Sequence, residues 1–127
     1  MNCKKAFYLC IGIVLGLLCL VCGIVIFVDP YFHYHKPAAQ FEYDINNESY
    51  QNPGIIRNFE HDSILVGSSM IEALWPSDFD ALYNINMIKI PFSGGSIKNH
   101  AISLEQEFSH NKNTKMVFYS IDWYALV

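Results

Sequence analysis

The sequence contains one long stretch without a single charged residue, and this stretch constrains the fold most. It runs for 23 residues, from Ala6 to Val28. A helix rises about 1.5 Å per residue, so a helix of this length crosses a hydrocarbon core of roughly 30 Å. Lys4 and Lys5 precede the stretch and Asp29 follows it. Because positively charged flanks stay in the cytoplasm, we predict a cytoplasmic tail at 1–5, a transmembrane anchor at 6–28 and export of the rest.

A cleaved signal peptide is the alternative to an uncleaved anchor. The apolar run exceeds the usual core of about 7–15 residues, and no small-x-small cleavage site occurs near residues 27–29. The sequence therefore favours a single-pass protein that contacts the lipid bilayer through residues 6–28. Gly12 and Gly16 have the G-x-x-x-G spacing of helix pairs, so a small anchored subunit that dimerises through this face is a further hypothesis. The oligomeric state stays open.

The remainder of the chain excludes several classes of protein. Residues 29–127 carry all 12 acidic residues but six of the eight basic ones, so their net charge is −6. A negative net charge does not favour binding to nucleic-acid phosphates, so the sequence argues against a nucleic-acid-binding protein. All four cysteines lie at or before Cys22, which argues against a disulfide scaffold or a thiolate zinc site in the exported part. We expect one small domain, no metal site and no cofactor.

Regular structure is predicted to begin at Ile55. Residues 29–54 contain three prolines and several Asn and Gln residues, which interrupt regular structure, so we interpret them as a juxtamembrane arm. His33 and His35 have no partner cluster, and we interpret them as packing or interface residues. From residue 55 onward, short apolar runs alternate with helical patterns. The predicted elements are a strand at 63–66, a helix at 69–74, a helix from Ser77, a strand at 83–90, a helix at 96–110 and a strand at 116–121.

Two details of these helices are also predicted. Ser77 and Asp80 have the spacing of a capping box at the start of the second helix. In the helix at 96–110, an apolar face of four residues is expected to be buried: Ile97, Ala101, Leu104 and Phe108. The order β-α-β-α-β with short connections predicts an α/β fold, in which helices cover a parallel sheet of about three strands.

Polar and glycine residues follow each predicted strand. Gly67-Ser68-Ser69-Met70 follows the first strand, Ser93-Gly94-Gly95-Ser96 the second, and Asp122-Trp123 the third. Carboxyl ends of parallel strands meet at one edge of a sheet, where ligands bind in open α/β folds. A serine at a helix start places a hydroxyl beside free N–H groups that stabilise an oxyanion. An ordinary Ser N-cap, a plain glycine turn and an Asp cap are the structural alternatives.

The order and spacing of these segments resemble the SGNH (GDSL-type) hydrolases, in particular membrane-anchored members of bacterial envelopes. Gly67-Ser68-Ser69-Met70 resembles their first block, with Ser68 in place of Asp, and Ser93-Gly94-Gly95 resembles their second. Asp122 stands where the third block carries Asn. Asp29-Pro30-Tyr31-Phe32-His33-Tyr34-His35-Lys36-Pro37 and Asn52-Pro53-Gly54 add to the resemblance, which extends from Lys4 to Leu126.

The resemblance implies a flavodoxin-like, three-layer domain over residues 55–127. It makes Ser69 the nucleophile, and it implies an oxyanion hole formed by Ser69 together with Gly94 or Gly95. Asp122 holds the third position, although a carboxylate donates no hydrogen bond unless it is protonated. The implied activity is that of an esterase or O-acyltransferase acting on cell-envelope glycans or polymers outside the bacterial plasma membrane.

One part of the SGNH pattern is missing from the sequence. These enzymes take their base from an Asp-x-x-His block, and no such string follows Asp122. A serine without a base has little nucleophilicity. We therefore expect this chain to be the N-terminal part of a longer protein and to be inactive by itself. The alternative function is a non-catalytic, membrane-tethered α/β scaffold, which the Asp at position 122 favours.

Overall fold

The computed structural model describes residues 3–36, 45 and 47–123. The chain divides into two compact units, Met1–Pro30 and Tyr31–Val127, which are described separately below. The first unit is dominated by helix α1, Cys3–Val28, which has no buried residue. α1 is long and apolar enough to cross a membrane, so the predicted apolar helix is confirmed. A signal sequence near the N-terminus can meet the same criterion of length and hydropathy.

The second unit is a mixed α/β domain. Its elements are α2 (Glu48–Asn58), β1 (Ser63–Gly67), the 3-10 helix η1 (Ser69–Ala73), α3 (Pro76–Tyr83), β2 (Met87–Pro91), α4 (Ile97–His110) and β3 (Met116–Tyr119). The strands form one parallel sheet in the order β2-β1-β3. Ser63 lies opposite Met87 on one side and Met116 on the other. β1 is therefore the central strand, as its uninterrupted apolar run predicts.

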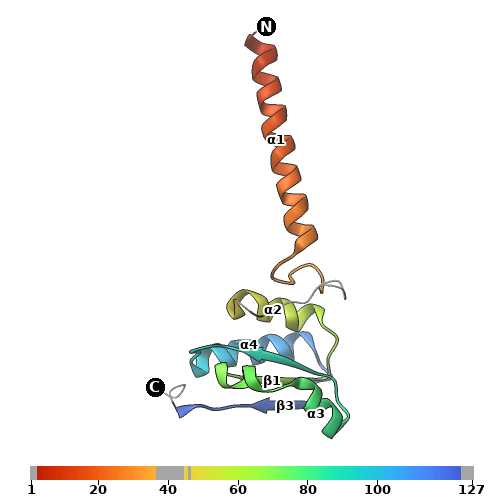
Figure 1. Cartoon of the computed structure of the whole chain (residues 1–127), viewed down its shortest axis with the longest axis vertical. Helices are drawn as coiled ribbons and strands as arrows, with labels where there is room; N and C mark the ends of the chain where they lie inside the picture. The colour runs from red at the N-terminus through yellow and green to blue at the C-terminus, as the bar shows by residue number, and fades with distance from the viewer. Residues whose placement is uncertain (1–2, 37–44, 46, 124–127) are drawn as a thin grey trace. The chain divides into compact units, whose positions relative to one another are not determined.

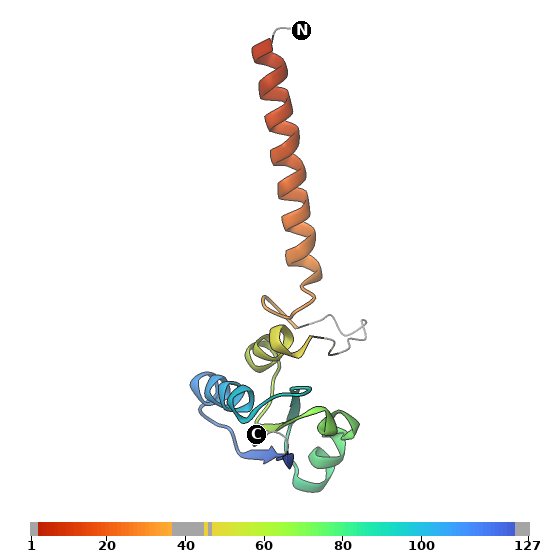
Figure 2. The same ribbon diagram turned by 90° about the vertical axis from the view of Figure 1, so that its left-hand side faces the viewer.

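Helices cover both faces of this sheet (Figure 1). On one face, Ile64 and Val66 of β1 pack in a core with Ile55 and Ile56 of α2, and Leu104 of α4 packs against it. On the other face, Leu65 packs with Ile71 of η1, and Phe79 of α3 borders the cluster. Figure 2 shows α4 and the η1–α3 segment on opposite sides of the strands. The predicted helix–sheet–helix layering is thus observed.

The second strand begins later than predicted. β2 starts at Met87, whereas Tyr83 is the last residue of α3, so the predicted strand at 83–90 is wrong at its start. The predicted capping box is also wrong: Trp75 occupies the N-cap position and Pro76 begins the helix. Proline suits a first helical position because its missing N–H is not needed there. Asp80 instead accepts a hydrogen bond from the Met87 N–H (2.8 Å).

The buried face of α4 differs from the predicted one. His100, Ser103 and Glu107 are buried, whereas Ile97 and Phe108 are 41% and 49% exposed. Ala101 is exposed and Leu104 is half-buried. Apolar periodicity failed here because three polar side chains occupy buried positions of the helix. Glu107 accepts hydrogen bonds from His61 and Thr114, and His100 bonds Tyr119 of β3.

Helix α2 was not predicted. The sequence predicted no regular structure between Asp29 and Gly54, but α2 begins at Glu48 and contains both Pro53 and Gly54. Pro53 is the sixth residue of α2, so it removes the hydrogen bond that an N–H at this position would donate to the Ser49 carbonyl. Gln51 supports the start of α2 because its side chain accepts a hydrogen bond from the Asn47 N–H (2.9 Å). Residues 37–44 of the predicted arm lie outside the described residues.

Candidate functional site

The segments that follow the three strands meet at one edge of the sheet. The backbone N–H of Phe92 donates to the carbonyl of Gly67 (2.8 Å), and that of Ser120 donates to the carbonyl of Val66 (2.9 Å). A side chain at Gly67 would place its Cβ 2.8 Å from the Cβ of Ser120, so glycine permits this close approach. The loops that contain Ser69, Gly94 and Asp122 therefore share the carboxyl edge, as the sequence predicts.

Ser68 is the buried member of the serine pair. Its side chain is fully buried and caps η1, and its hydroxyl accepts a hydrogen bond from the Met70 N–H (3.2 Å). The same hydroxyl donates to Oδ2 of Asp122. Ser68 and Asp122, the two residues that differ from the expected SGNH blocks, are thus hydrogen-bonded to each other. In this contact Asp122 is an acceptor, so Oδ2 does not serve as a donor to an oxyanion.

Ser69 has the opposite character. It is exposed and is the first residue of η1, directly after the tip of the central strand. Neither its hydroxyl nor its backbone N–H has a hydrogen-bond partner among the residues that the structure describes. A group outside the protein can therefore approach both atoms. The hydroxyl by itself is a weak nucleophile at its ordinary pKa.

The glycine turn distinguishes between its two glycines. The Gly95 N–H donates to the carbonyl of Phe92 (2.8 Å) and closes the turn over residues 92–95. Gly94 has a φ of +64°, a conformation that glycine adopts without steric cost. Gly94 is exposed, and within the described part of the chain its N–H has no acceptor. Of the two glycines, Gly94 has the N–H that remains available.

Ser93 connects this turn to two other elements, a connection that sequence reasoning missed. Its Oγ lies 2.7 Å from Oε1 of Glu72 on η1 and 2.5 Å from Oε1 of Glu48 at the start of α2. One feature of the sequence indicated that Glu72 lies near the candidate site: it follows Ser69 by three residues. In a 3-10 helix that spacing places two side chains on the same side, but the prediction treated this segment as an ordinary helix.

Two histidine side chains of the domain are buried, those of His61 and His100. His100 is buried, and its Nδ1 lies 3.0 Å from Oη of Tyr119. Burial lowers the pKa of His100, and the negative charge of nearby Asp122 partly offsets this lowering. His61 pairs with Glu107, and it precedes β1 at the amino edge of the sheet. Across the described ranges, none of the histidines has a hydrogen bond to Ser69.

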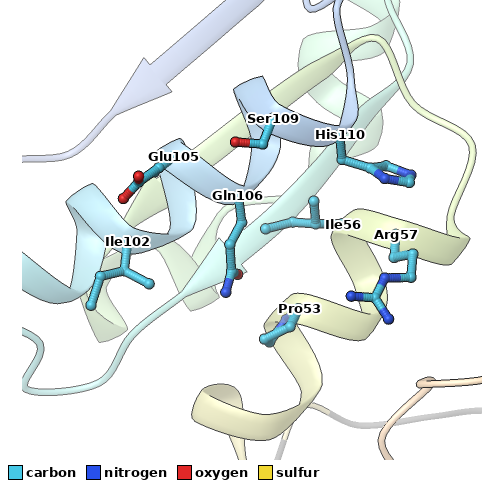
Figure 3. Close-up of a pocket in the computed structure, with 8 residues that line it drawn as sticks. All are labelled: Pro53, Ile56, Arg57, Ile102, Glu105, Gln106, Ser109 and His110. Carbon is cyan, nitrogen blue, oxygen red and sulfur yellow. The ribbon is translucent and has the colours of Figure 1, made fainter.

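A separate hollow lies away from this edge. It is a groove of about 490 Å³ between α2 and α4, lined by Pro53, Ile56, Arg57, Ile102, Glu105, Gln106, Ser109 and His110. Figure 3 shows the side chains of Ile56 and Gln106 between the two helices, with Arg57 and His110 at one end. The lining includes neither Ser69 nor Gly94 nor Asp122, so the groove and the candidate site are different places.

No group of three or more His, Cys, Asp or Glu residues is arranged to hold a metal ion within the part of the chain that the structure describes. The fold and the site define a mixed α/β domain that follows an N-terminal apolar helix and collects serine and glycine residues at one sheet edge. No protein-family model, curated protein or solved structure matches the chain.

Proposed function

We propose that this domain is a membrane-anchored, SGNH-like serine esterase or O-acyltransferase that acts outside the plasma membrane on cell-envelope polymers. The observation that carries the proposal is the environment of Ser69. Its hydroxyl is exposed at the tip of the central strand, and the N–H groups of Ser69 and Gly94 have no partner within the described residues. A nucleophile and two oxyanion donors at one sheet edge are what acyl transfer requires.

The proposed reaction uses these groups in two stages. Oγ of Ser69 forms a bond to the acyl carbonyl carbon, and the hydroxyl proton passes to a base. The carbonyl oxygen becomes an oxyanion that accepts hydrogen bonds from the Ser69 and Gly94 N–H groups. Collapse of this intermediate expels the alcohol, which takes up the proton and leaves an acyl-serine. Water then completes hydrolysis, or a polymer hydroxyl completes transfer.

The base is the element that the proposal still requires. SGNH-like enzymes take it from an Asp-x-x-His block, and no such block follows Asp122 in residues 1–127. His61 is paired with Glu107, and His100 is bonded to Tyr119 through Nδ1, while its Nε2 has no partner among the described residues. Neither histidine has a hydrogen bond to Ser69. We therefore expect residues 1–127 by themselves to be inactive and expect activity where an Asp-x-x-His block is supplied.

The experiment compares hydrolysis of 4-nitrophenyl acetate by two variants, with the reading frame extended past residue 127 wherever the gene continues. Ser69→Ala should lower the rate by a factor on the order of 10³ or more, because it removes the nucleophile. Ser77→Ala, an exposed serine on α3, is the matched control and should retain the parent rate. Equal rates above the uncatalysed background for Ser69→Ala and its parent would remove Ser69 from the mechanism.

A non-catalytic scaffold is the second candidate function. One observation favours it: Asp122 occupies the position of the SGNH Asn and accepts a hydrogen bond instead of donating one. A frame that continues without an Asp-x-x-His block, together with no esterase activity above the Ser69→Ala background, would support the scaffold over the enzyme.

A further inference from the structure

Three side-chain oxygen atoms from three elements meet beside the candidate site. Ser93 comes from the glycine turn, Glu72 from η1 and Glu48 from the start of α2, with the carboxylate oxygens 2.7 Å and 2.5 Å from the Ser93 hydroxyl. A hydroxyl has one hydrogen, so Ser93 donates to one carboxylate at a time. Donation to Glu72 ties the turn to η1, and donation to Glu48 ties it to α2.

The Glu72 contact joins the two halves of the candidate site. A 3-10 helix has three residues per turn, so the side chains of Ser69 and Glu72 project from the same side of η1. Ser93 immediately precedes Gly94, and its carbonyl belongs to the same peptide unit as the Gly94 N–H. Because peptide units are planar, holding Ser93 restricts the direction in which that N–H points.

We propose that Glu72 and Ser93 are positioning residues that hold the Gly94 N–H in register with Ser69. This inference rests on the proposed function, because it assigns these two residues to the same oxyanion site. Neither residue touches the substrate in this scheme. Glu48 belongs to the same oxygen cluster but binds the turn to α2, so its removal leaves the hydrogen of Ser93 entirely to Glu72.

Phenylboronic acid tests the position of the Gly94 N–H relative to Ser69 without requiring catalysis. The Ser69 oxygen donates a lone pair to the trigonal boron, a B–O bond forms, and the hydroxyl proton leaves to solvent. The resulting tetrahedral boronate carries the negative charge that the oxyanion donors stabilise. The full chain in lipid nanodiscs is titrated, and the adduct is measured by ¹¹B NMR. Ser69→Ala should abolish the adduct, which tests the proposed function itself.

The positioning residues should change the affinity for phenylboronic acid in a specific pattern. Ser93→Ala and Glu72→Ala should each weaken binding by about 2- to 10-fold, the effect of one net hydrogen bond. Ser93→Thr and Glu72→Gln should restore binding, because a hydroxyl donor and an amide oxygen acceptor remain. Glu48→Ala is the matched control and should not weaken binding. Loss of the adduct in Ser69→Ala with parent affinity in Ser93→Ala and Glu72→Ala would overturn the positioning role alone.

Amide hydrogen exchange provides a measurement that does not depend on the nucleophile. The Gly95 N–H closes the turn, so a turn released from η1 should exchange this hydrogen about 2- to 10-fold faster in Ser93→Ala and Glu72→Ala. If phenylboronic acid gives no adduct with the parent chain, the proposed role of Ser69 as nucleophile is contradicted. The exchange rates alone then show whether the contact between Ser93 and Glu72 holds the turn. Unchanged exchange at Gly95 in both variants would overturn the inference.

Discussion

At the scale of single residues, His61 shows how a buried polar group is held in one protonation state. Its side chain is 3% exposed, and that of Glu107 is fully buried. Nε2 lies 2.8 Å from Oε2 of Glu107, and Nδ1 lies 2.7 Å from the carbonyl of Phe59. Both neighbours are acceptors, so both ring nitrogens must carry hydrogen. The geometry therefore describes an imidazolium–carboxylate pair between α4 and the segment that precedes β1.

The electrostatics of this pair agree with its geometry. Burial opposes the charge on His61, but the hydrogen bonds to Glu107 and to the Phe59 carbonyl outweigh burial and raise the pKa of His61. Burial likewise favours the neutral form of Glu107, yet hydrogen bonds from His61 and Thr114 lower its pKa. Each charge thus stabilises the other, and removing one partner from such a pair typically costs about 3–5 kcal/mol.

Stability should therefore depend on pH in a defined direction. The contribution of His61 is complete below its unfolded pKa of 6.5 and is lost as the pH rises through the raised folded value. The contribution of Glu107 is present above 4.5 and is lost as the pH falls through its lowered folded value. The contribution of this pair should therefore be largest between about pH 4.5 and 6.5 and should fall as the pH rises above that window. The lowered pKa of His100 acts in the other direction, because its buried neutral ring loses stability as the pH falls below 6.5.

Thermal unfolding of the chain in detergent micelles, followed by near-ultraviolet circular dichroism, measures this dependence. Glu107→Gln should lower the melting temperature near pH 6 and flatten the fall at alkaline pH, because it removes the charge that raises the pKa of His61. His110→Gln, at an exposed position on the same helix, should keep the parent profile. A parent-like alkaline slope in Glu107→Gln would show that the pair is not its source.

At the scale of secondary-structure elements, the Ser68–Asp122 hydrogen bond connects the start of η1 to the segment that follows β3. Ser68→Ala removes this bond and the N-cap acceptor for the Met70 N–H. We expect a loss of about 1–3 kcal/mol in the free energy of unfolding, measured by denaturant titration in micelles. Ser109→Ala, at an exposed position on α4, should change this free energy by less than about 0.5 kcal/mol. Equal effects of the two substitutions would contradict the structural role of Ser68.

The sequence predicted best those elements whose signal is apolar burial. β1 was found from its apolar run, and the parallel sheet from the alternation of short strands and helices. α2 was missed because Pro53 and Gly54 normally interrupt helices, whereas here tertiary packing of Ile55 and Ile56 holds the helix together. Local pattern does not contain that long-range packing information.

The same limit applies to the candidate site: its position in the fold was predicted, but the partners of its side chains were not. The convergence of residues 69, 94 and 122 on one edge follows from strand direction, which the alternation of elements determines. The contacts of Ser93 with Glu48 and Glu72 join residues 45 and 21 positions apart in sequence. The bond between Ser68 and Asp122 spans 54 positions. No local pattern specifies such side-chain partners, and only the folded chain identifies them.

At the scale of the whole molecule, the chain combines two units with opposite surface chemistry. α1 carries apolar side chains and no buried residue, whereas residues 29–127 have a net charge of −6. An apolar surface on every side of a helix is stable in lipid. This contrast supports the proposal that α1 holds an acidic domain at a membrane surface, and it makes the orientation of the helix the decisive property of the molecule.

The charges that flank α1 predict this orientation. Lys4 and Lys5 lie before the apolar run, and positive residues close to a membrane helix remain cytoplasmic. An alkaline phosphatase fused after residue 127 should therefore be active, because this enzyme folds correctly outside the cytoplasm. Changing both residues, Lys4→Glu with Lys5→Glu, should reduce the phosphatase activity per fusion protein. Lys98→Glu with Lys112→Glu is the matched control, since these lysines lie far beyond the 15–20 residues within which flanking charge acts.

The same fusion tests whether α1 is cleaved. It should stay in the membrane pellet after an alkaline wash and retain its full mass. A soluble, shortened fusion protein would identify α1 as a cleaved signal sequence, and parent activity in the Lys4/Lys5 variant would show that these charges do not orient the helix.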